Sequence, residues 1–120
     1  MFTYSQSTGH FCHDDLLLCE GYSGFGIGKN NPSEQSVKKV GPIPVGSYQI
    51  STPFDSVDFG PICFYLAPDK SNVMYDRSGF LIHGDSIKNP GNASHGCIVL
   101  QHSTRSVIAA INPRRLLVIP

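Results

Sequence analysis

The chain has 120 residues, and its nine basic and nine acidic side chains give a formal net charge of zero. This length predicts a single domain, residues 1–120, and the short basic runs exclude the positive stripe that a nucleic-acid backbone requires. No apolar run approaches the roughly 20 residues of a membrane span. The N-terminus lacks the basic and apolar segments of a secretory signal, so we expect a chain that is made in the cytoplasm without a signal peptide. Such a chain acts in the cytoplasm, leaves by a route needing no cleaved signal, or lacks part of its N-terminus.

Twelve glycines and nine prolines divide the chain into short segments of about strand length. Residues 2–8 and the apolar run 16–19 predict an opening hairpin, and the glycine-rich residues 21–31 predict a loop. Further strands are expected at 45–51, 62–66, 80–83, 97–100 and 116–119.

Only one segment has the periodicity of a helix. Ser103 or Thr104 could cap its start, and Asn112-Pro113 ends it. Its apolar stripe comprises Val107, Ile108 and Ile111. Together these elements predict a mostly β domain, a sandwich or partly closed barrel, with one short C-terminal helix.

The four cysteines are Cys12, Cys19, Cys63 and Cys97. No C-x-x-C pair occurs, so we expect no metal and no other cofactor. Cys12 and Cys19 could face each other across a hairpin, where a disulfide would contribute about 2.5 kcal/mol in an oxidising compartment. The alternative is that both are small buried hydrophobic residues.

The candidate chemistry lies in residues 80–85 and 94–98, where a histidine ends one apolar run and a cysteine begins the next. A free thiol is only about 3% thiolate at pH 7, and a neighbouring imidazolium is a usual source of stabilisation for the anion. If the two strands are neighbours, the end of the first lies beside the beginning of the second, which sets Cys97 beside His83. We therefore predict Cys97 as nucleophile and His83 as base.

The residues before the cysteine fit the same chemistry. A side chain at Gly96 would obstruct a substrate carbonyl that approaches Cys97. The N–H groups of Gly96 and Cys97 are predicted to stabilise the oxyanion of the tetrahedral intermediate, by about 3 kcal/mol per donor. Ser94 and His95 would shape the approach of the substrate.

The stretch Ser94-His95-Gly96-Cys97, preceded by His83-Gly84, resembles the active-site signature of the YkuD-like L,D-transpeptidases. Residues 44–50 resemble the Pro-x-Gly-x-Tyr/Phe strand of that family. Further blocks make the chain most similar to the short type VI secretion effectors of this superfamily; these are residues 4–9, 21–24, 41–44 and 80–85.

The resemblance implies that Cys97 attacks the L,D amide before the terminal D-Ala of a peptidoglycan tetrapeptide stem and keeps the acyl group as a thioester. Water as acceptor gives an L,D-carboxypeptidase, a D-amino acid gives exchange, and another stem gives a cross-link. It also implies an antibacterial effector that the type VI secretion machinery delivers to the periplasm of target cells, with a cognate immunity protein in the producing cell.

One position departs from the family pattern. Many YkuD-like enzymes carry Arg two residues after the nucleophile, where this chain has Val99. Arg105 or Arg77 could supply a substrate-facing cation instead. The alternative is that both are solvated surface charges.

The candidate substrate-binding set is completed by Gly84, Asp85, Tyr22 and Ser23. Asp85, which follows Gly84, could orient His83, face the free amine of the substrate, or be a turn residue. The family often orients its histidine through a backbone carbonyl, which requires no carboxylate. Tyr22 and Ser23 either line the cleft or pack in the interior. The competing function is a non-catalytic β domain that binds cell-wall peptides or a partner protein.

Overall fold

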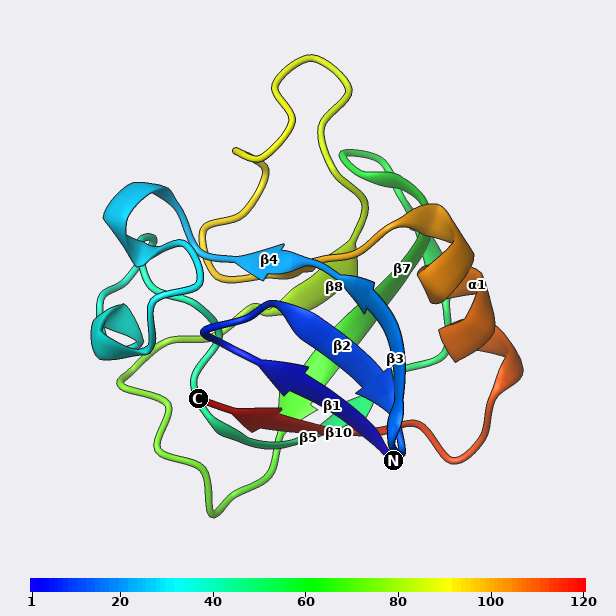
Figure 1. Ribbon diagram of the computed structural model, residues 1–120, viewed down its shortest axis with the longest axis horizontal. Helices are drawn as coiled ribbons and strands as arrows, with labels where there is room; N and C mark the ends of the chain where they lie inside the picture. Colours follow the sequence, from blue (N-terminus) through cyan, green and yellow to red (C-terminus); the bar gives the residue numbers. More distant parts are fainter.

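A computed structural model describes residues 1–120 as a mostly β domain with one α-helix (Figure 1). The strands form a nearly closed, barrel-like sheet in the order β3-β2-β1-β10-β5-β7-β8-β9-β4, with β6 paired to β7 alone. This architecture confirms the predicted fold class. The elements are β1 (Phe2–Ser5), β2 (His10–His13), β3 (Leu16–Glu20), β4 (Tyr22–Ser23), the 3-10 turns η1 (Gly26–Gly28) and η2 (Pro32–Glu34), β5 (Gly46–Ile50), β6 (Phe54–Ser56), β7 (Gly60–Pro68), β8 (Leu81–His83), β9 (Ile98–Val99), α1 (His102–Ala110) and β10 (Arg115–Ile119).

The predicted opening hairpin is wrong in its pairing. Strand β1 is shorter than expected, because a turn closed by the bond from the Gly9 N–H to the Ser5 carbonyl reverses the chain. Gly9 has a φ of +74°, a conformation that glycine adopts without a Cβ penalty. Strand β2 follows this turn and lies between β1 and β3, so residues 2–8 and 16–19 are not neighbours.

The register of β2 and β3 also decides the state of two cysteines. Cys19 pairs with Phe11, whereas Cys12 pairs with Leu17. Because neighbouring residues of a strand face opposite sides, the thiols of Cys12 and Cys19 point away from each other. Both thiols are free, so they form no disulfide, and both are half-buried rather than buried. Cys19 packs against the main hydrophobic cluster, in part as the alternative expected.

The glycine-rich residues 21–31 are not entirely a loop. Tyr22 and Ser23 form the short edge strand β4, which pairs antiparallel with β9. Strand β6 was also not predicted, and it forms a hairpin with β7. The other predicted strands are present with ends shifted by a few residues.

Helix α1 begins one to two residues before the predicted caps. Gln101 is the N-cap residue, and no side chain caps the helix by a hydrogen bond. Ile108 is buried as expected, whereas Val107 is 38% exposed. The helix packs on β7 and ends before Asn112-Pro113 as predicted. No helix in the structure has the length and apolar character needed to cross a bilayer.

Strands β7, β8 and β9 present matching residues to the core. Phe64 pairs with Ile82, Ile82 pairs with Ile98, and all three side chains are buried in the main hydrophobic cluster. Side chains one position away on each strand therefore lie on the opposite face of the sheet. That opposite face carries His83 and Cys97.

Candidate active site

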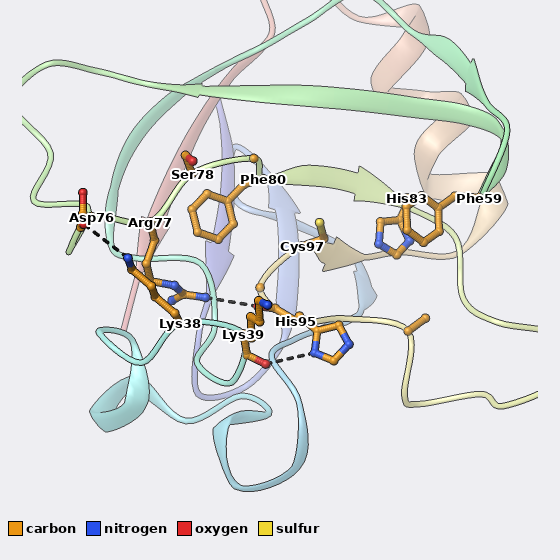
Figure 2. A pocket seen from close by; sticks show the side chains of 13 residues that line it. Lys38, Lys39, Phe59, Asp76, Arg77, Ser78, Phe80, His83, His95 and Cys97 are labelled. Atoms are coloured by element: carbon orange, nitrogen blue, oxygen red, sulfur yellow. Dashed lines mark hydrogen bonds and ion pairs between the residues drawn. The ribbon is translucent and has the colours of Figure 1, made fainter.

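His83 and Cys97 share one face of two adjacent strands. Strands β8 and β9 run parallel, with His83 opposite Val99, so Cys97 lies beside Leu81. Because β8 and β9 are parallel, the end of one strand does not lie beside the beginning of the other as expected. The two residues are diagonal neighbours, with Cα atoms about 8 Å apart for ordinary strand spacings. Both side chains line a cavity of about 380 Å³ (Figure 2).

The Cys97 thiol is half-buried at the centre of this cavity. Its sulfur accepts a hydrogen bond from the Leu81 backbone N–H at 3.4 Å. Burial raises the pKa of the Cys97 thiol, and the Leu81 N–H opposes that rise by stabilising the anion. The resting sulfur is consequently a neutral thiol with one donor already placed for the thiolate.

The His83 ring is fully buried and held in one tautomer. Its Nδ1 lies 2.7 Å from the Gly84 carbonyl oxygen, so Nδ1 is the protonated donor. The other nitrogen, Nε2, is buried and has no hydrogen-bond partner. Burial lowers the pKa of His83 below its ordinary value of 6.5, more than the bond to Gly84 raises it. The ring is therefore a neutral imidazole with a free lone pair on Nε2.

These two pKa directions correct the expectation of a thiolate beside an imidazolium. Burial favours the uncharged form of both Cys97 and His83. No hydrogen bond joins Cys97 Sγ to His83 Nε2, although both line the same cavity. The geometry suits an acid–base pair that becomes charged only during a reaction.

Phe59 covers the His83 ring, and nothing in the sequence pointed to it. The rings are stacked with centroids 3.7 Å apart and an angle of 10° between their planes. Phe59 belongs to the turn of the β6–β7 hairpin and remains 39% exposed. This contact depends on how the hairpin folds back over the sheet, which no local motif reveals.

Gly96 has a steric reason to be glycine in addition to the predicted one. Its φ is +143°, and a Cβ there would lie 2.7 Å from Arg77 Nη2 and 2.7 Å from the Phe80 ring. Crowding by these two cavity-lining side chains and the positive φ therefore exclude a side chain at Gly96, and the role of Gly96 in substrate access stays a prediction. The Gly96 N–H donates to Ser94 Oγ at 3.1 Å, so it is not free as an oxyanion donor. The N–H of Cys97 is the remaining predicted donor.

Two buried serines hold the loop that ends at Cys97. Ser94 Oγ donates to the Cys97 carbonyl at 2.5 Å and accepts from the Gly24 N–H at 3.0 Å. Ser23 Oγ donates to the Gly96 carbonyl at 2.8 Å. Because both hydroxyls are fully buried, Ser94 and Ser23 position the loop and do not line the cavity.

His95, in contrast, does line the cavity. Its ring stacks on Phe25 with centroids 5.0 Å apart. Its Nδ1 donates to the Lys39 carbonyl at 3.0 Å, which joins the cysteine loop to residues 38–40. The predicted place of His95 beside the approach to Cys97 agrees with this geometry.

Asp85 does not contact His83. It accepts hydrogen bonds from the Tyr22 hydroxyl at 2.6 Å and from the backbone N–H of Gly91. Tyr22 in turn accepts from the Ala93 N–H at 2.9 Å, and its pKa is raised to about 12 by burial and by the bond to Asp85. Asp85 is thus a turn residue that, with Tyr22, closes the loop over residues 85–93.

Arg105 is 7% exposed and turned away from the cavity. Its Nε donates to the Leu100 carbonyl at 3.0 Å, and its Nη1 donates to the carbonyls of Pro61 and Ile62 at 2.8 Å each. It also lies behind Gly84, where a Cβ would come within 2.7 Å of Nη2. Arg105 therefore supports the base of the β6–β7 hairpin, and it is neither solvated nor placed to contact a substrate in the cavity.

Arg77 is equally buried but does line the cavity. Its guanidinium lies over the Phe80 ring, 5.1 Å from the centroid. Its donors are all directed to main-chain carbonyls, those of Gln35, Gly41, Pro42 and His95. The alternative of a solvated surface charge is therefore wrong for Arg77 as well.

The fold and the pattern of site residues define an L,D-transpeptidase-like β domain. The chain matches the family model of the Tlde1 domain over residues 18–120, and it therefore belongs to the Tlde1 family of type VI secretion L,D-transpeptidase effectors. Comparison with the curated proteins gives no match.

Among solved structures, the crystal structure of the helical cell shape determining protein Pgp2 from Campylobacter jejuni is similar to this chain. The TM-score is 0.63 and the sequence identity 17%, over 98% of this chain and 46% of that chain. At this identity the likeness shows the fold alone, and the chain spans about half the length of that structure.

Proposed function

We propose that the chain is a cysteine acyltransferase that cleaves the L,D amide before the terminal D-Ala of tetrapeptide stems. Transfer to water would make it an L,D-carboxypeptidase, and transfer to a D-amino acid would exchange the terminal residue. The observation that carries this proposal is the shared cavity, in which a half-buried thiol and an imidazole with a free Nε2 lie on one face of the sheet. Membership of a peptidoglycan-targeting family supplies the substrate class.

The first half-reaction begins with proton transfer. As the substrate carbonyl approaches, His83 Nε2 takes the thiol proton of Cys97, and the sulfur adds to the carbonyl carbon. The Leu81 N–H, already directed at the sulfur, stabilises the thiolate, and the Gly84 carbonyl stabilises the imidazolium through Nδ1. The Cys97 N–H stabilises the oxyanion of the tetrahedral intermediate.

Collapse of the intermediate breaks the C–N bond. The imidazolium of His83 delivers its proton to the leaving nitrogen, D-Ala departs as an amine, and the acyl group remains on Cys97 as a thioester. In the second half-reaction His83 takes a proton from water or from a D-amino acid, which attacks the thioester and restores the Cys97 thiol. Depletion of tetrapeptide donors would weaken the wall of the target cell, and the producing cell would need an immunity protein.

The test is incubation of the pure protein with tetrapeptide muropeptides, followed by quantification of released D-Ala. The wild type should release D-Ala, and Cys97→Ala should release none, while Cys63→Ala keeps most of the activity. Cys63 is the matched control because it is another buried thiol outside the cavity. Release by Cys97→Ala, or no release by the wild type, contradicts the proposal and favours a non-catalytic cell-wall-binding domain.

A further inference from the structure

The cavity has a charged end on the side of Cys97 opposite to His83. Figure 2 shows Lys38, Asp76 and Arg77 on one side of the thiol and the His83 ring on the other. Lys39, below the thiol beside His95, also lines the cavity. This end therefore holds three basic side chains and one acidic side chain, an excess of positive charge that favours an anionic ligand.

Lys39 is exposed, and no ion pair joins it to an acidic side chain. Its backbone has a φ of +63°, a left-handed conformation that is uncommon for a residue with a Cβ. The hydrogen bond from His95 Nδ1 to the Lys39 carbonyl holds this conformation against the cysteine loop. The backbone thus holds Lys39, which forms no ion pair, at the edge of the cavity.

Two further charged groups lie at this end of the cavity. The Lys38–Asp76 ion pair can be replaced by contacts with a ligand, and the Arg77 guanidinium adds to the positive charge. Lys38 and Asp76 form an ion pair at 3.3 Å, with side chains 61% and 96% exposed. Such exposed pairs contribute little to stability, so a ligand that brings its own charges can replace either partner. The Arg77 guanidinium is bonded only to neutral carbonyls, so its charge is not compensated by an acid.

The positions of thiol and imidazole orient the substrate. His83 must give its proton to the leaving nitrogen, so the leaving D-Ala lies toward His83. The acyl half of the donor then extends from Cys97 to the opposite side, where the charged end lies. This step rests on the proposed function.

We propose that Lys39 and the Lys38–Asp76 pair form a subsite for the charged side-chain end of the third stem residue, with Lys39 contacting its carboxylate. The third residue of such a stem is usually diaminopimelate, whose side chain ends in one carboxylate and one ammonium group. In this subsite the carboxylate contacts Lys39 and Lys38, and the ammonium group contacts Asp76. The subsite selects stems in which this carboxylate is free over stems in which it is amidated.

The first experiment measures kcat/KM for D-Ala release from two tetrapeptides that differ only in amidation of the diaminopimelate side-chain carboxylate. The wild type should prefer the free carboxylate by about fivefold, the upper range for one exposed ion pair. Lys39→Gln should remove most of this preference. Lys70→Gln is the control, because Lys70 is exposed, has the same charge and lines none of the cavities described.

The second experiment needs no peptidoglycan substrate. The ratio of Cys97 alkylation rates with iodoacetate and iodoacetamide, mapped by mass spectrometry, reports the local positive charge. Lys39→Gln should lower this ratio by about threefold at low ionic strength, and Lys70→Gln should leave it unchanged.

The outcomes separate the two proposals. No D-Ala release from either peptide by the wild type overturns the proposed function and this assignment with it. Release at equal rates from both peptides, or equal alkylation ratios in Lys39→Gln and Lys70→Gln, overturns the subsite alone.

Discussion

The two halves of the candidate site are built by different means. On the cysteine side, buried hydroxyls and a buried guanidinium form hydrogen bonds to the backbone of residues 94–97. On the histidine side, one carbonyl fixes the ring and one aromatic side chain covers it. The first half depends on directional polar bonds, and the second depends on burial.

Because of this difference, the position of Cys97 and the protonation of His83 depend on different interactions. The place of Cys97 is set by a loop with several partners, so loss of one partner should change stability and geometry together. The protonation of His83 is set mainly by exclusion of water, since burial is the largest cause of its lowered pKa. A change in its cover should therefore alter the pH dependence more than the fold.

The largest effect is expected from the base itself. His83→Ala removes the free Nε2 of the buried imidazole in the cavity, and we expect kcat/KM for D-Ala release to fall about 1,000-fold, as for loss of a general acid–base. His102→Ala, in an exposed residue of α1, is the control and should keep full activity. Equal activities of the two variants would show that His83 is not the base.

The cysteine side should respond next. Ser94→Ala leaves the Gly24 and Gly96 N–H groups and the Cys97 carbonyl without their buried partner, so we expect a loss of about 2–3 kcal/mol in the free energy of unfolding and a tenfold or larger fall in activity. Urea titration measures the stability. Ser71→Ala, at an exposed residue with no such bonds, should change neither. An unchanged Ser94→Ala would end the claim that this hydroxyl positions the loop.

A smaller and qualitatively different effect is expected from the cover of the histidine. Phe59→Ala admits water to His83, so its pKa should rise toward 6.5 from below. Because the base acts as a neutral imidazole, the acidic limb of the pH profile of kcat/KM should move to higher pH, with a loss of only a few fold at pH 8. Phe59→Leu keeps an apolar cover and should shift the limb less. A limb that does not move would contradict a role for burial.

The smallest effect is expected at the exposed loop over residues 85–93. Tyr22→Phe removes the hydroxyl that joins Asp85 to the Ala93 N–H, and such an exposed bond contributes about 1 kcal/mol. Amide hydrogen exchange in this loop should accelerate about fivefold, with activity within a factor of three. Tyr75→Phe, with no hydrogen-bonded hydroxyl, should match the wild type. Unchanged exchange in Tyr22→Phe would show that other bonds hold the loop.

The features that could be predicted from the sequence are those determined by residues close together in the chain. Apolar runs between glycines and prolines marked most of the strands, and residues 94–97 carry the cysteine, its glycine and its serine within one short motif. The pairing of β1 with β2 was missed because a four-residue turn at Gly9 outweighed the continuous pattern of residues 2–8.

The remaining features depend on contacts between distant segments. Arg77 and Arg105 were expected either to face the substrate or to be solvated at the surface, as most arginines are. They are buried because carbonyls from separate loops converge on each guanidinium. Phe59 reaches His83, and Lys39 reaches His95, only through the folded arrangement of hairpin and loop. The spacing of residues in the sequence does not predict either of these contacts.

The protonated state of the Cys97 sulfur has a consequence for survival outside the producing cell. Peroxide and other oxidants react with the thiolate, so a cysteine that keeps its proton at rest is oxidised slowly. In the acyltransferase proposed above, the nucleophile would thereby stay intact in an oxidising compartment until a stem peptide enters. The proposed mechanism correspondingly requires a proton to leave the sulfur in every catalytic cycle, and the neutral imidazole of His83 in the same cavity is the group proposed to take it.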